Sequence, residues 1–381
     1  MSFIFFSIAE FLSGALEFFV NVLISISNFS NLPFSKIYVV TPKIFLVIII
    51  YIIFVALNYI YKIYHDRNPS ITKIRFRNLI AAYKYHFIQH KKKYKKRIFI
   101  ISLLIVLVFY IFHFIPKNLK IYFVDVGQGD CTFIVTPKNK TILIDGGGSM
   151  GSDFDVGEST LIPYILDRGY KKIDLMLISH FDQDHVGGLL TVLKDLKVNK
   201  VCIPKQEENS ENYQKFLEIV KEKDIPVSIV KLGDKIKIEN SLYFDILWPQ
   251  EDQIAENRIN NNAIVMKLNY NGFSCLFTGD IEKIAEDKMV NLYKDKSVLE
   301  SDILKVAHHG SKTSTTENFL GLVNPKNCLI GVGKNNLFGH PSNEILERLE
   351  ELDVKVYRTD INGEISIIVN NKGKYIINSM Y

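Results

Sequence analysis

Cysteine is scarce in this chain of 381 residues, and this scarcity limits the kinds of site that the protein can form. No two cysteines have CxxC spacing, so the sequence indicates neither a zinc finger nor a disulfide framework. Three of the four lie inside apolar runs, where we expect buried thiols: Cys131, Cys202 and Cys275. Internal repeats and low-complexity segments are also lacking, and the net charge is only +5. The length allows two or three domains, each with its own core.

Long apolar runs occur only in the first third of the chain. Residues 43–62 and 98–115 are almost free of charged side chains and have aromatic residues at their flanks. Each run is about long enough to cross the roughly 30 Å hydrocarbon core of a bilayer as a helix, and the flanking aromatics are typical of membrane interfaces. We therefore predict two transmembrane helices within a membrane region that covers residues 1–116.

A strongly basic loop, residues 62–97, separates these two runs. It contains many Lys and Arg residues and a single acid, Asp66. The positive-inside rule places such a loop in the cytoplasm, so the chain after Pro116 is expected on the extracytoplasmic side of the cell membrane. Basic residues with interleaved aromatics also suit nucleic-acid binding, although a lipid-facing role is favoured for a loop between two spans.

The N-terminal segment, about residues 3–27, is apolar but contains Glu10 and Glu17, which lie seven apart on one helix face. It has no preceding basic stretch, which argues against a secretory signal peptide. Two alternatives stay open. The segment is either an amphipathic helix in the interface or a membrane helix that packs its Glu face against other helices. Residues 31–42 then form a short extended connector.

From residue 117 onward, the pattern changes to strands that alternate with helices, which predicts a layered α/β domain over 117–381. Several polar side chains follow directly after apolar strands: Asp145, His180, Asp280, His308 and His309. The carboxyl ends of strands at one edge of a sheet are where α/β domains collect their site residues. We expect these side chains to meet in one cleft.

The most concentrated polar motif is "SHFDQDHVGG", residues 179–188. It places two histidines and two aspartates at the end of a predicted strand and the start of a helix. Imidazoles and carboxylates without a thiolate suit Zn²⁺ or Mn²⁺. With Asp280 and His309 the ligands suffice for two ions, and two bridged ions are a known device for hydrolysing phosphate esters.

Four motifs in order, HxDxDH followed by Gly-Gly, then "FTGD", "LKVAHHGS" and "GHPS", resemble the metallo-β-lactamase superfamily. The sequence is most similar to the ComEC branch of DNA-uptake proteins, in which "VDVGQGD" and "IDGG" precede the metal motif. The resemblance covers 117–381. It implies an αββα sandwich with two divalent metal ions at one sheet edge, and hydrolysis by a hydroxide that these ions activate.

The resemblance also implies roles for single residues. The expected metal ligands are His180 and Asp182 for the first ion, Asp184 and His185 for the second ion, Asp280 as the bridge, and His309 or His340 as the ligand that completes the coordination of the second ion. The candidate catalytic residues are Asp184, His308 and Lys305. Residues expected around the ions or the substrate are Asp145 behind the site, Gln128 and Asp130 on the entrance loop, Ser311 near a phosphate, and Asn262.

Two departures from the superfamily pattern matter. Asp182 stands where most members have His, a change that ComEC-like sequences share and that favours harder ions such as Mn²⁺. No His occurs between positions 186 and 307, where many members have a further ligand. Asn262 and the two asparagines before it stand near that place, so we expect a loosely held first ion. Both departures argue against β-lactam hydrolysis.

The sequence thus predicts a membrane-anchored metal-dependent hydrolase, a phosphodiesterase or nuclease that acts on DNA during competence-related uptake. Its expected partners are DNA or another phosphodiester, and membrane lipid. One alternative is a cell-surface phosphodiesterase that acts on a small or cell-wall ester. Another is an accessory part of a DNA-translocating channel. That channel would need a separate polytopic competence subunit, because two or three helices are too few to line a pore.

Overall fold

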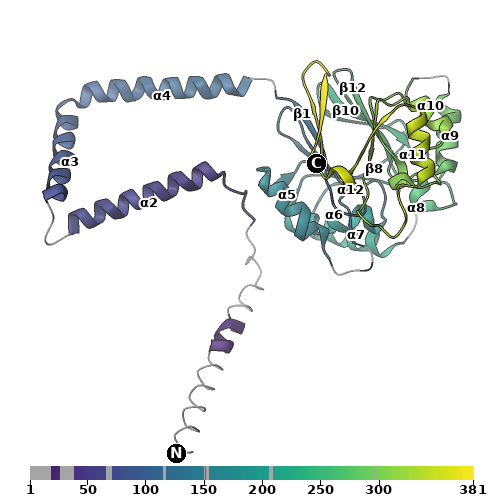
Figure 1. Cartoon of the computed structure of the whole chain (residues 1–381), viewed down its shortest axis with the longest axis horizontal. Helices are drawn as coiled ribbons and strands as arrows, with labels where there is room; N and C mark the ends of the chain where they lie inside the picture. The colour runs from purple at the N-terminus through teal and green to yellow at the C-terminus, as the bar shows by residue number, and fades with distance from the viewer. Residues whose placement is uncertain are drawn as a thin grey trace, which may run out of the picture.

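The computed structural model describes residues 19–25, 38–65, 71–114, 117–149, 151, 154–205, 209–294 and 297–381. These form a helical part and an α/β part (Figure 1). Residues 19–25 are helical, and the rest of the predicted N-terminal segment lies outside the described residues.

The helical part consists of α2 (Ile44–His65), α3 (Ile71–Gln89) and α4 (Lys91–Phe114). Helices α2 and α4 extend away from the α/β part, and α3 joins their far ends (Figure 1). Among the side chains that the structure describes, one helical stretch, Ile44–Lys62, is long and apolar enough to cross a membrane. The second predicted span lies in α4, but several of its side chains and its last residue fall outside the described set. That span stays a prediction.

Two sheets form the centre of the α/β part. The first has the strand order β17-β16-β1-β2-β3-β5-β7-β8, with antiparallel pairing up to β3 and parallel pairing from β3 to β8. Its strands are β1 (Leu119–Phe123), β2 (Thr132–Val135), β3 (Thr141–Ile144), β5 (Leu175–Leu177), β7 (Val201–Pro204), β8 (Val227–Val230), β16 (Ile365–Val369) and β17 (Tyr375–Ser379). A small separate pair, β4 (Lys172–Ile173) and β6 (Lys197–Val198), is parallel.

The second sheet has the order β15-β14-β13-β12-β11-β10-β9 and changes from antiparallel to parallel pairing at β12. Its strands are β9 (Lys235–Glu239), β10 (Leu242–Trp248), β11 (Val265–Tyr270), β12 (Phe273–Phe277), β13 (Ile303–Lys305), β14 (Asn327–Ile330) and β15 (Lys355–Arg358). In both sheets the parallel strands end beside one another, and the polar residues that follow them are thereby gathered at one edge.

Helices cover the outer face of each sheet. A π-helical turn (Gly157–Leu161), α5 (Ile162–Asp167), α6 (Gln183–Asp195) and α7 (Glu211–Glu222) pack on the first sheet. Helices α9 (Lys283–Tyr293), α10 (Glu317–Val323) and α11 (Asn343–Glu351) pack on the second, and α8 (Arg258–Asn261) and α12 (Thr359–Asn362) are single turns. Apolar side chains from both sheets, such as Ile121 and Phe244, fill the space between them. The layers therefore have the predicted order α, β, β, α.

The predicted connector before α2 docks on the α/β part. The Tyr38 hydroxyl donates to Asp195 at 2.5 Å, and the Thr41 amide donates to the Leu166 carbonyl at 3.2 Å. Burial and the neighbouring Asp195 carboxylate raise the pKa of Tyr38 to about 12. The helical part is thus joined to the α/β part at two places, before α2 and after α4.

Candidate metal centre

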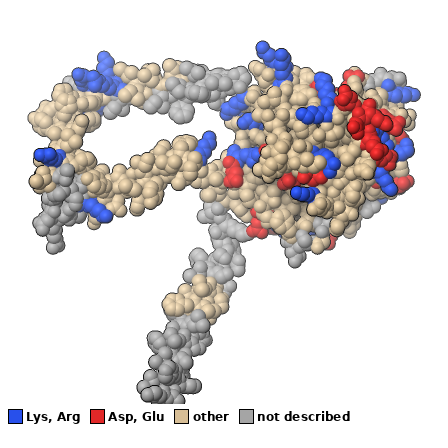
Figure 2. Space-filling model, in the orientation of Figure 1, with Lys and Arg blue, Asp and Glu red and all other residues tan. Residues whose placement is uncertain are grey.

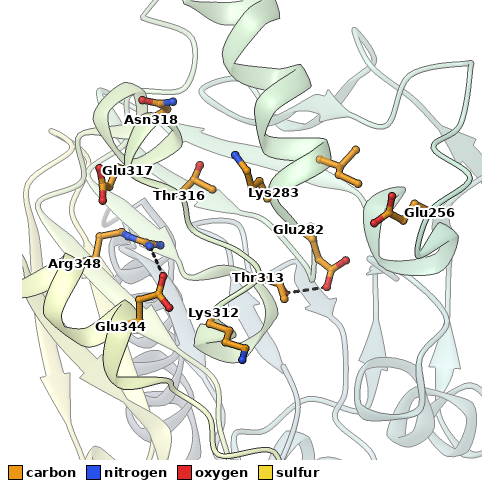
Figure 3. Close-up of a pocket in the computed structure, with 11 residues that line it drawn as sticks. Glu256, Glu282, Lys283, Lys312, Thr313, Thr316, Glu317, Asn318, Glu344 and Arg348 are labelled. Atoms are coloured by element: carbon orange, nitrogen blue, oxygen red, sulfur yellow. Dashed lines mark hydrogen bonds and ion pairs between the residues drawn. The ribbon is translucent and has the colours of Figure 1, made fainter.

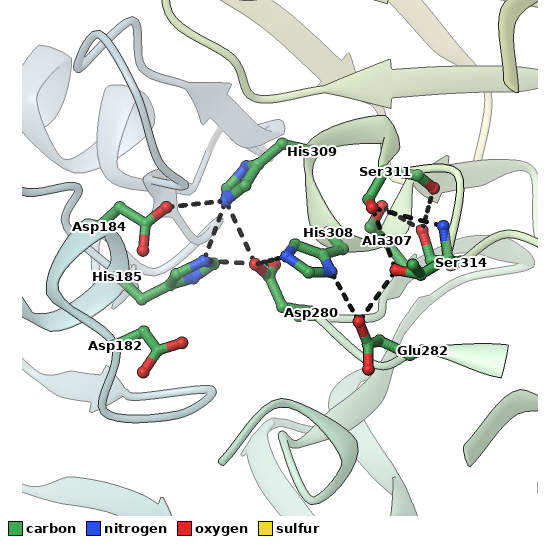
Figure 4. A network of polar contacts seen from close by, with 12 residues as sticks. Asp182, Asp184, His185, Asp280, Glu282, Ala307, His308, His309, Ser311 and Ser314 are labelled. Atoms are coloured by element: carbon green, nitrogen blue, oxygen red, sulfur yellow. Dashed lines mark hydrogen bonds and ion pairs between the residues drawn. The ribbon is translucent and has the colours of Figure 1, made fainter. Parts of the chain in front are cut away.

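Three strand ends and one helix start supply the polar side chains of the site. His180 follows β5, Asp280 follows β12, and His309 follows β13. Asp184 and His185 lie in the first turn of α6. Because β5 belongs to one sheet and β12 and β13 to the other, the site lies where the edges of the two sheets meet (Figure 4).

Four buried side chains form the centre of this site: Asp130, His185, Asp280 and His309, whose ligand atoms lie within 4.8 Å of one another. Asp280 lies between the two rings, with Oδ1 3.2 Å from His185 Nε2 and Oδ2 3.3 Å from His309 Nε2. Asp184 adds a further carboxylate oxygen, Oδ2, at 3.2 Å from His309 Nε2. Figure 4 shows Asp184, His185, Asp280 and His309 converging on one point.

The orientation of the two rings indicates what they bind. His185 Nδ1 lies 3.1 Å from Asp145 Oδ2, and His309 Nδ1 lies 2.7 Å from the Gly331 carbonyl oxygen. Both partners are acceptors, so each Nδ1 carries a hydrogen, and the Nε2 of each ring points inward, where it carries either a second proton or a lone pair for a cation. The two Nε2 atoms are 3.2 Å apart. Two facing lone pairs between carboxylates require a cation, and a metal ion supplies one.

Asp145 holds this arrangement from behind, as predicted. Its carboxylate accepts hydrogen bonds from the Ser179 amide at 2.8 Å and the Ser179 hydroxyl at 2.7 Å, in addition to His185. A carboxylate behind a ligating histidine fixes the ring and raises its basicity.

The carboxylates of the cluster also need a compensating positive charge. Burial by itself lowers the pKa of His309, but Asp280, Asp130 and Asp184 raise it to about 10. Burial by itself raises the pKa of Asp280, yet His185 and His309 lower it well below its usual value. Protons on the imidazoles therefore balance the carboxylates when no metal is bound. A divalent ion would replace those protons.

His180 and Asp182 lie beside this cluster, where the resemblance places the first ion. Nδ1 of His180 is 2.9 Å from the Ser179 hydroxyl, while its buried Nε2 has no hydrogen-bond partner among the described residues. Asp182 Oδ2 is 3.7 Å from that Nε2. Burial and the neighbouring His185 lower the pKa of His180 well below its usual value, so the ring is neutral. A buried, neutral imidazole with an orphaned nitrogen fits a metal ligand.

His308 lies at the outer side of the cluster and is partly exposed. Its Nε2 is 3.9 Å from Asp280 Oδ2, and its Nδ1 is 3.5 Å from Glu282 Oε1 (Figure 4). His308 and His309 both have left-handed backbone, with φ of 49° and 52°, which is costly for residues with a Cβ and is typical of functional sites. His340 lies beside His308 at a ring distance of 5.8 Å, so the structure brings His309 into the cluster and leaves His340 outside it.

The structure changes the interpretation of Lys305 and Asp130. Lys305 is only 3% exposed, and its ammonium group pairs with Asp130, donates to the Gly279 carbonyl at 3.2 Å and lies 3.7 Å from Asp280 Oδ1. A group so enclosed balances the carboxylates of the cluster, and a catalytic role of Lys305 stays a prediction. Asp130 was expected at the entrance but is buried in the cluster. Together they form an internal ion pair.

Three further predicted residues form polar contacts in the loops around the site. Gln128 accepts a hydrogen bond from the Gly333 amide at 3.2 Å, which ties the entrance loop to the strand end after β14. The buried Ser311 hydroxyl is 3.0 Å from that of Thr313. Asn262 bonds to the amide and the carbonyl of Ile254, at 2.9 and 2.8 Å. Asn262 therefore holds its own loop, and its expected place beside the ions stays a prediction.

Sequence reasoning missed Glu282 and the carbonyl of Gly331. Glu282 faces His308 and also accepts from the Thr313 hydroxyl at 2.9 Å. Its position two residues after "FTGD" was the available signal. No side chain marks a backbone acceptor such as the Gly331 carbonyl, so the sequence carried no signal for it.

Comparison with known proteins agrees with this geometry. The family model of the metallo-β-lactamase superfamily matches residues 124–333. ComE operon protein 3 of Bacillus subtilis is 35% identical over 260 residues, which cover 65% of this chain and 33% of that protein. Recombination protein 2 of Haemophilus influenzae is 30% identical over 243 residues, or 64% of this chain and 28% of that protein.

A third relative, Competence protein ComA of Neisseria gonorrhoeae, is 26% identical over 249 residues, which cover 65% of this chain and 32% of that protein. The chain thus spans about a third of the length of these relatives. The family match, which extends over more than half of the chain, and these relatives agree with the predicted branch. The protein therefore belongs to the metallo-β-lactamase superfamily, in its ComEC-type branch.

Proposed function

We propose that this protein is a membrane-anchored, metal-dependent phosphodiesterase that cleaves DNA during uptake. The observation that carries the proposal is the inward-facing pair of His185 and His309 Nε2 atoms, 3.2 Å apart and flanked by Asp184 and Asp280. These donors, with His180 and Asp182 alongside, suit two borderline or hard divalent ions such as Zn²⁺ or Mn²⁺. Such ions would supply an activated water and neutralise the charge of a phosphodiester.

The protein's own residues would prepare the site for that substrate. Asp145 and the Gly331 carbonyl hold the two ligating rings at fixed angles. Asp280 lies between the two rings and would be a ligand of the metal together with them. His308 faces outward from the cluster with Glu282 behind it, where its ring can donate to a phosphate oxygen. The positive charges of the metal ions and the imidazole would then face the side from which the phosphate enters the site.

DNA is favoured as the substrate by the relatives, one of which is a competence protein by name. The membrane anchor is supported by the apolar helix Ile44–Lys62 and by the position of α3, at the end of the helical part farthest from the α/β part (Figure 1). With the basic segment in the cytoplasm, the hydrolase domain would lie outside. A separate polytopic competence subunit is the partner that a channel role would require.

A small or cell-wall phosphoester is the second candidate, and the charge around the site supports it. A cavity of about 560 Å³ next to His308 is lined by four glutamates, Glu256, Glu282, Glu317 and Glu344, against three cations, Lys283, Lys312 and Arg348 (Figure 3). Figure 2 shows further acidic side chains gathered over α11 and its neighbours. Such a surface repels a long polyanion more than it repels a small ester.

The test uses the full chain in nanodiscs, loaded with Mn²⁺ or Zn²⁺. Its substrates are linear double-stranded DNA, a single-stranded oligonucleotide and methyl p-nitrophenyl phosphate. We expect cleavage of all three, and its loss in Asp184→Asn but not in the exposed control Asp353→Asn. Metal content, measured by mass spectrometry, reports on loading independently of activity. Normal loading without phosphodiester cleavage would refute the proposal, and cleavage of the small ester alone would establish the second candidate.

A further inference from the structure

The loop of residues 334–340, "KNNLFGH", exposes apolar side chains beside the metal centre. Leu337 is 99% exposed and Phe338 is 50% exposed. We propose that this loop is a nucleobase-binding subsite, in which Phe338 stacks on a base next to the phosphate to be cleaved. This inference rests on the proposed function and adds to it a preference for nucleic acid with an accessible, unpaired base.

The loop presents these side chains in a fixed position. The Asn336 side chain donates to the carbonyls of Gly333 and His340, at 3.1 and 2.6 Å, and accepts from the amides of Phe338 and His340, at 3.2 and 3.0 Å. These bonds close the loop on itself and keep Leu337 and Phe338 at its tip. Since water disfavours exposed apolar surface, a rigid loop that maintains it points to a ligand.

A continuous series of rings connects this tip to the metal centre. His309 and His308 have ring centroids 6.3 Å apart, and those of His308 and His340 are 5.8 Å apart. His340 and Phe338 lie 5.9 Å apart with only 16° between their planes. Phe338 is therefore the outermost ring of a series that begins at a metal-ligand candidate. A base stacked on Phe338 would leave its phosphate free to reach His308.

The charges near the site favour this side for a nucleic-acid strand. Within the described part of the chain, the structure gives the exposed Lys334, at the start of the loop, no ion-pair partner, so it is available for a backbone phosphate. Three cations line the glutamate-lined cavity (Figure 3), and two of them are already paired, Lys283 with Asp287 and Arg348 with Glu344, each at 3.0 Å. Since the four glutamates of the cavity outnumber its three cations, a strand is favoured to pass the loop.

The small size of the apolar tip argues against a protein partner. A stable protein interface buries roughly 800 Å² on each side, whereas this tip offers two side chains next to polar ones. A single base covers one aromatic ring, and stacking of this kind accepts any base because every base has a π-face. The geometry therefore fits a strand that is bound without sequence preference.

The experiment compares Phe338→Ala and Phe338→Trp in the full chain in nanodiscs, with Ile376→Ala as a control at another exposed apolar residue. Two single-stranded oligonucleotides are used, one with all its bases and one with abasic deoxyriboses at its centre. Binding is followed by fluorescence anisotropy and cleavage by gel. Thermal unfolding of each variant checks that the fold is intact.

We expect Phe338→Ala to weaken binding of the complete oligonucleotide roughly 5- to 150-fold. Phe338→Trp and Ile376→Ala should bind it like the unchanged protein, and all forms should bind the abasic oligonucleotide equally. An equal loss on both oligonucleotides, or no loss on either, overturns the subsite while leaving the phosphodiesterase proposal intact. If the unchanged protein cleaves the small ester but neither binds nor cleaves DNA, the DNA substrate and the subsite are both refuted.

Discussion

His185 and His309 face each other across 3.2 Å through their Nε2 atoms, while each ring gives its Nδ1 hydrogen to a fixed acceptor. Two neutral rings alone cannot satisfy this arrangement, because each Nε2 would then turn a lone pair toward the other. Either protons or a metal ion must lie among the Nε2 atoms and the carboxylates of Asp184 and Asp280. The same groups therefore link metal binding to pH.

Metal binding should stabilise the protein more as the pH rises from about 6.5 to about 10. The pKa of His309 is raised to about 10 in the metal-free fold, above its unfolded value of roughly 6.5. Its protonation thus stabilises the fold fully below pH 6.5, and this contribution is lost as the pH rises through 10. Metal competes with those protons, so its affinity increases over the same range.

The measurement is the melting temperature of the metal-loaded protein minus that of the chelator-treated protein, taken at several pH values. In this difference, the contributions of groups that titrate alike in both forms cancel. We expect it to grow steadily between pH 6.5 and 9. A difference that stays constant with pH would show that His309 does not exchange a proton for metal.

Replacing Lys305 by Met should destabilise the chelator-treated protein by about 3–5 kcal/mol, because it removes the ammonium group that pairs with the buried Asp130 carboxylate. The loss should be smaller in the metal-loaded protein, since the ions supply part of the missing positive charge. Lys326→Met is the matched control, because this ammonium pairs with Asp302 at 2.6 Å but is 70% exposed. It should cost less than about 1 kcal/mol. If the loss of stability is equal with and without metal, Lys305 does not interact with the metal site.

Membrane orientation can be tested with single added cysteines, because the native ones are all buried. In intact cells, a membrane-impermeant maleimide should label Lys372→Cys on the hydrolase domain and leave Lys93→Cys unlabelled. Both positions are exposed in the structure. After the cells are permeabilised, both should react. Labelling at position 93 in intact cells would reverse the proposed topology.

The sequence predicted the α/β layers from local pattern, and the family resemblance supplied their αββα order and the set of expected ligands. Apolar strands that end in His or Asp bring these residues to one sheet edge, and the ordered motifs identified which ones belong together. The direction of Lys305 could not be predicted, because a lysine in an apolar strand can point to solvent or inward. Its direction is decided by Asp130, which a distant part of the chain supplies. The hydrogen bonds of Asn262 could not be predicted for a similar reason, since they go to a loop that the pattern does not define.

Gly129 shows how the "VDVGQGD" motif supports the metal centre. It has φ of +116°, and a Cβ on it would lie 2.0 Å from the Asp184 carbonyl oxygen, to which the Asp130 amide donates at 3.2 Å. Gly129→Ala must therefore push Asp184 away from His309. We expect about a 10- to 100-fold loss of metal affinity, as for other disturbances of groups that hold ligands.

Gly127→Ala provides the matched comparison. Gly127 also has positive φ, +75°, but nothing lies within 4 Å of its Cβ position. The substitution should cost about 1–2 kcal/mol of stability through backbone strain and leave metal affinity nearly unchanged. Titration of the chelator-stripped variants with Zn²⁺, followed by calorimetry, distinguishes the two effects. If both alanine variants bind metal equally well, the contact between Gly129 and Asp184 does not position the ligand, and the motif acts through backbone conformation alone.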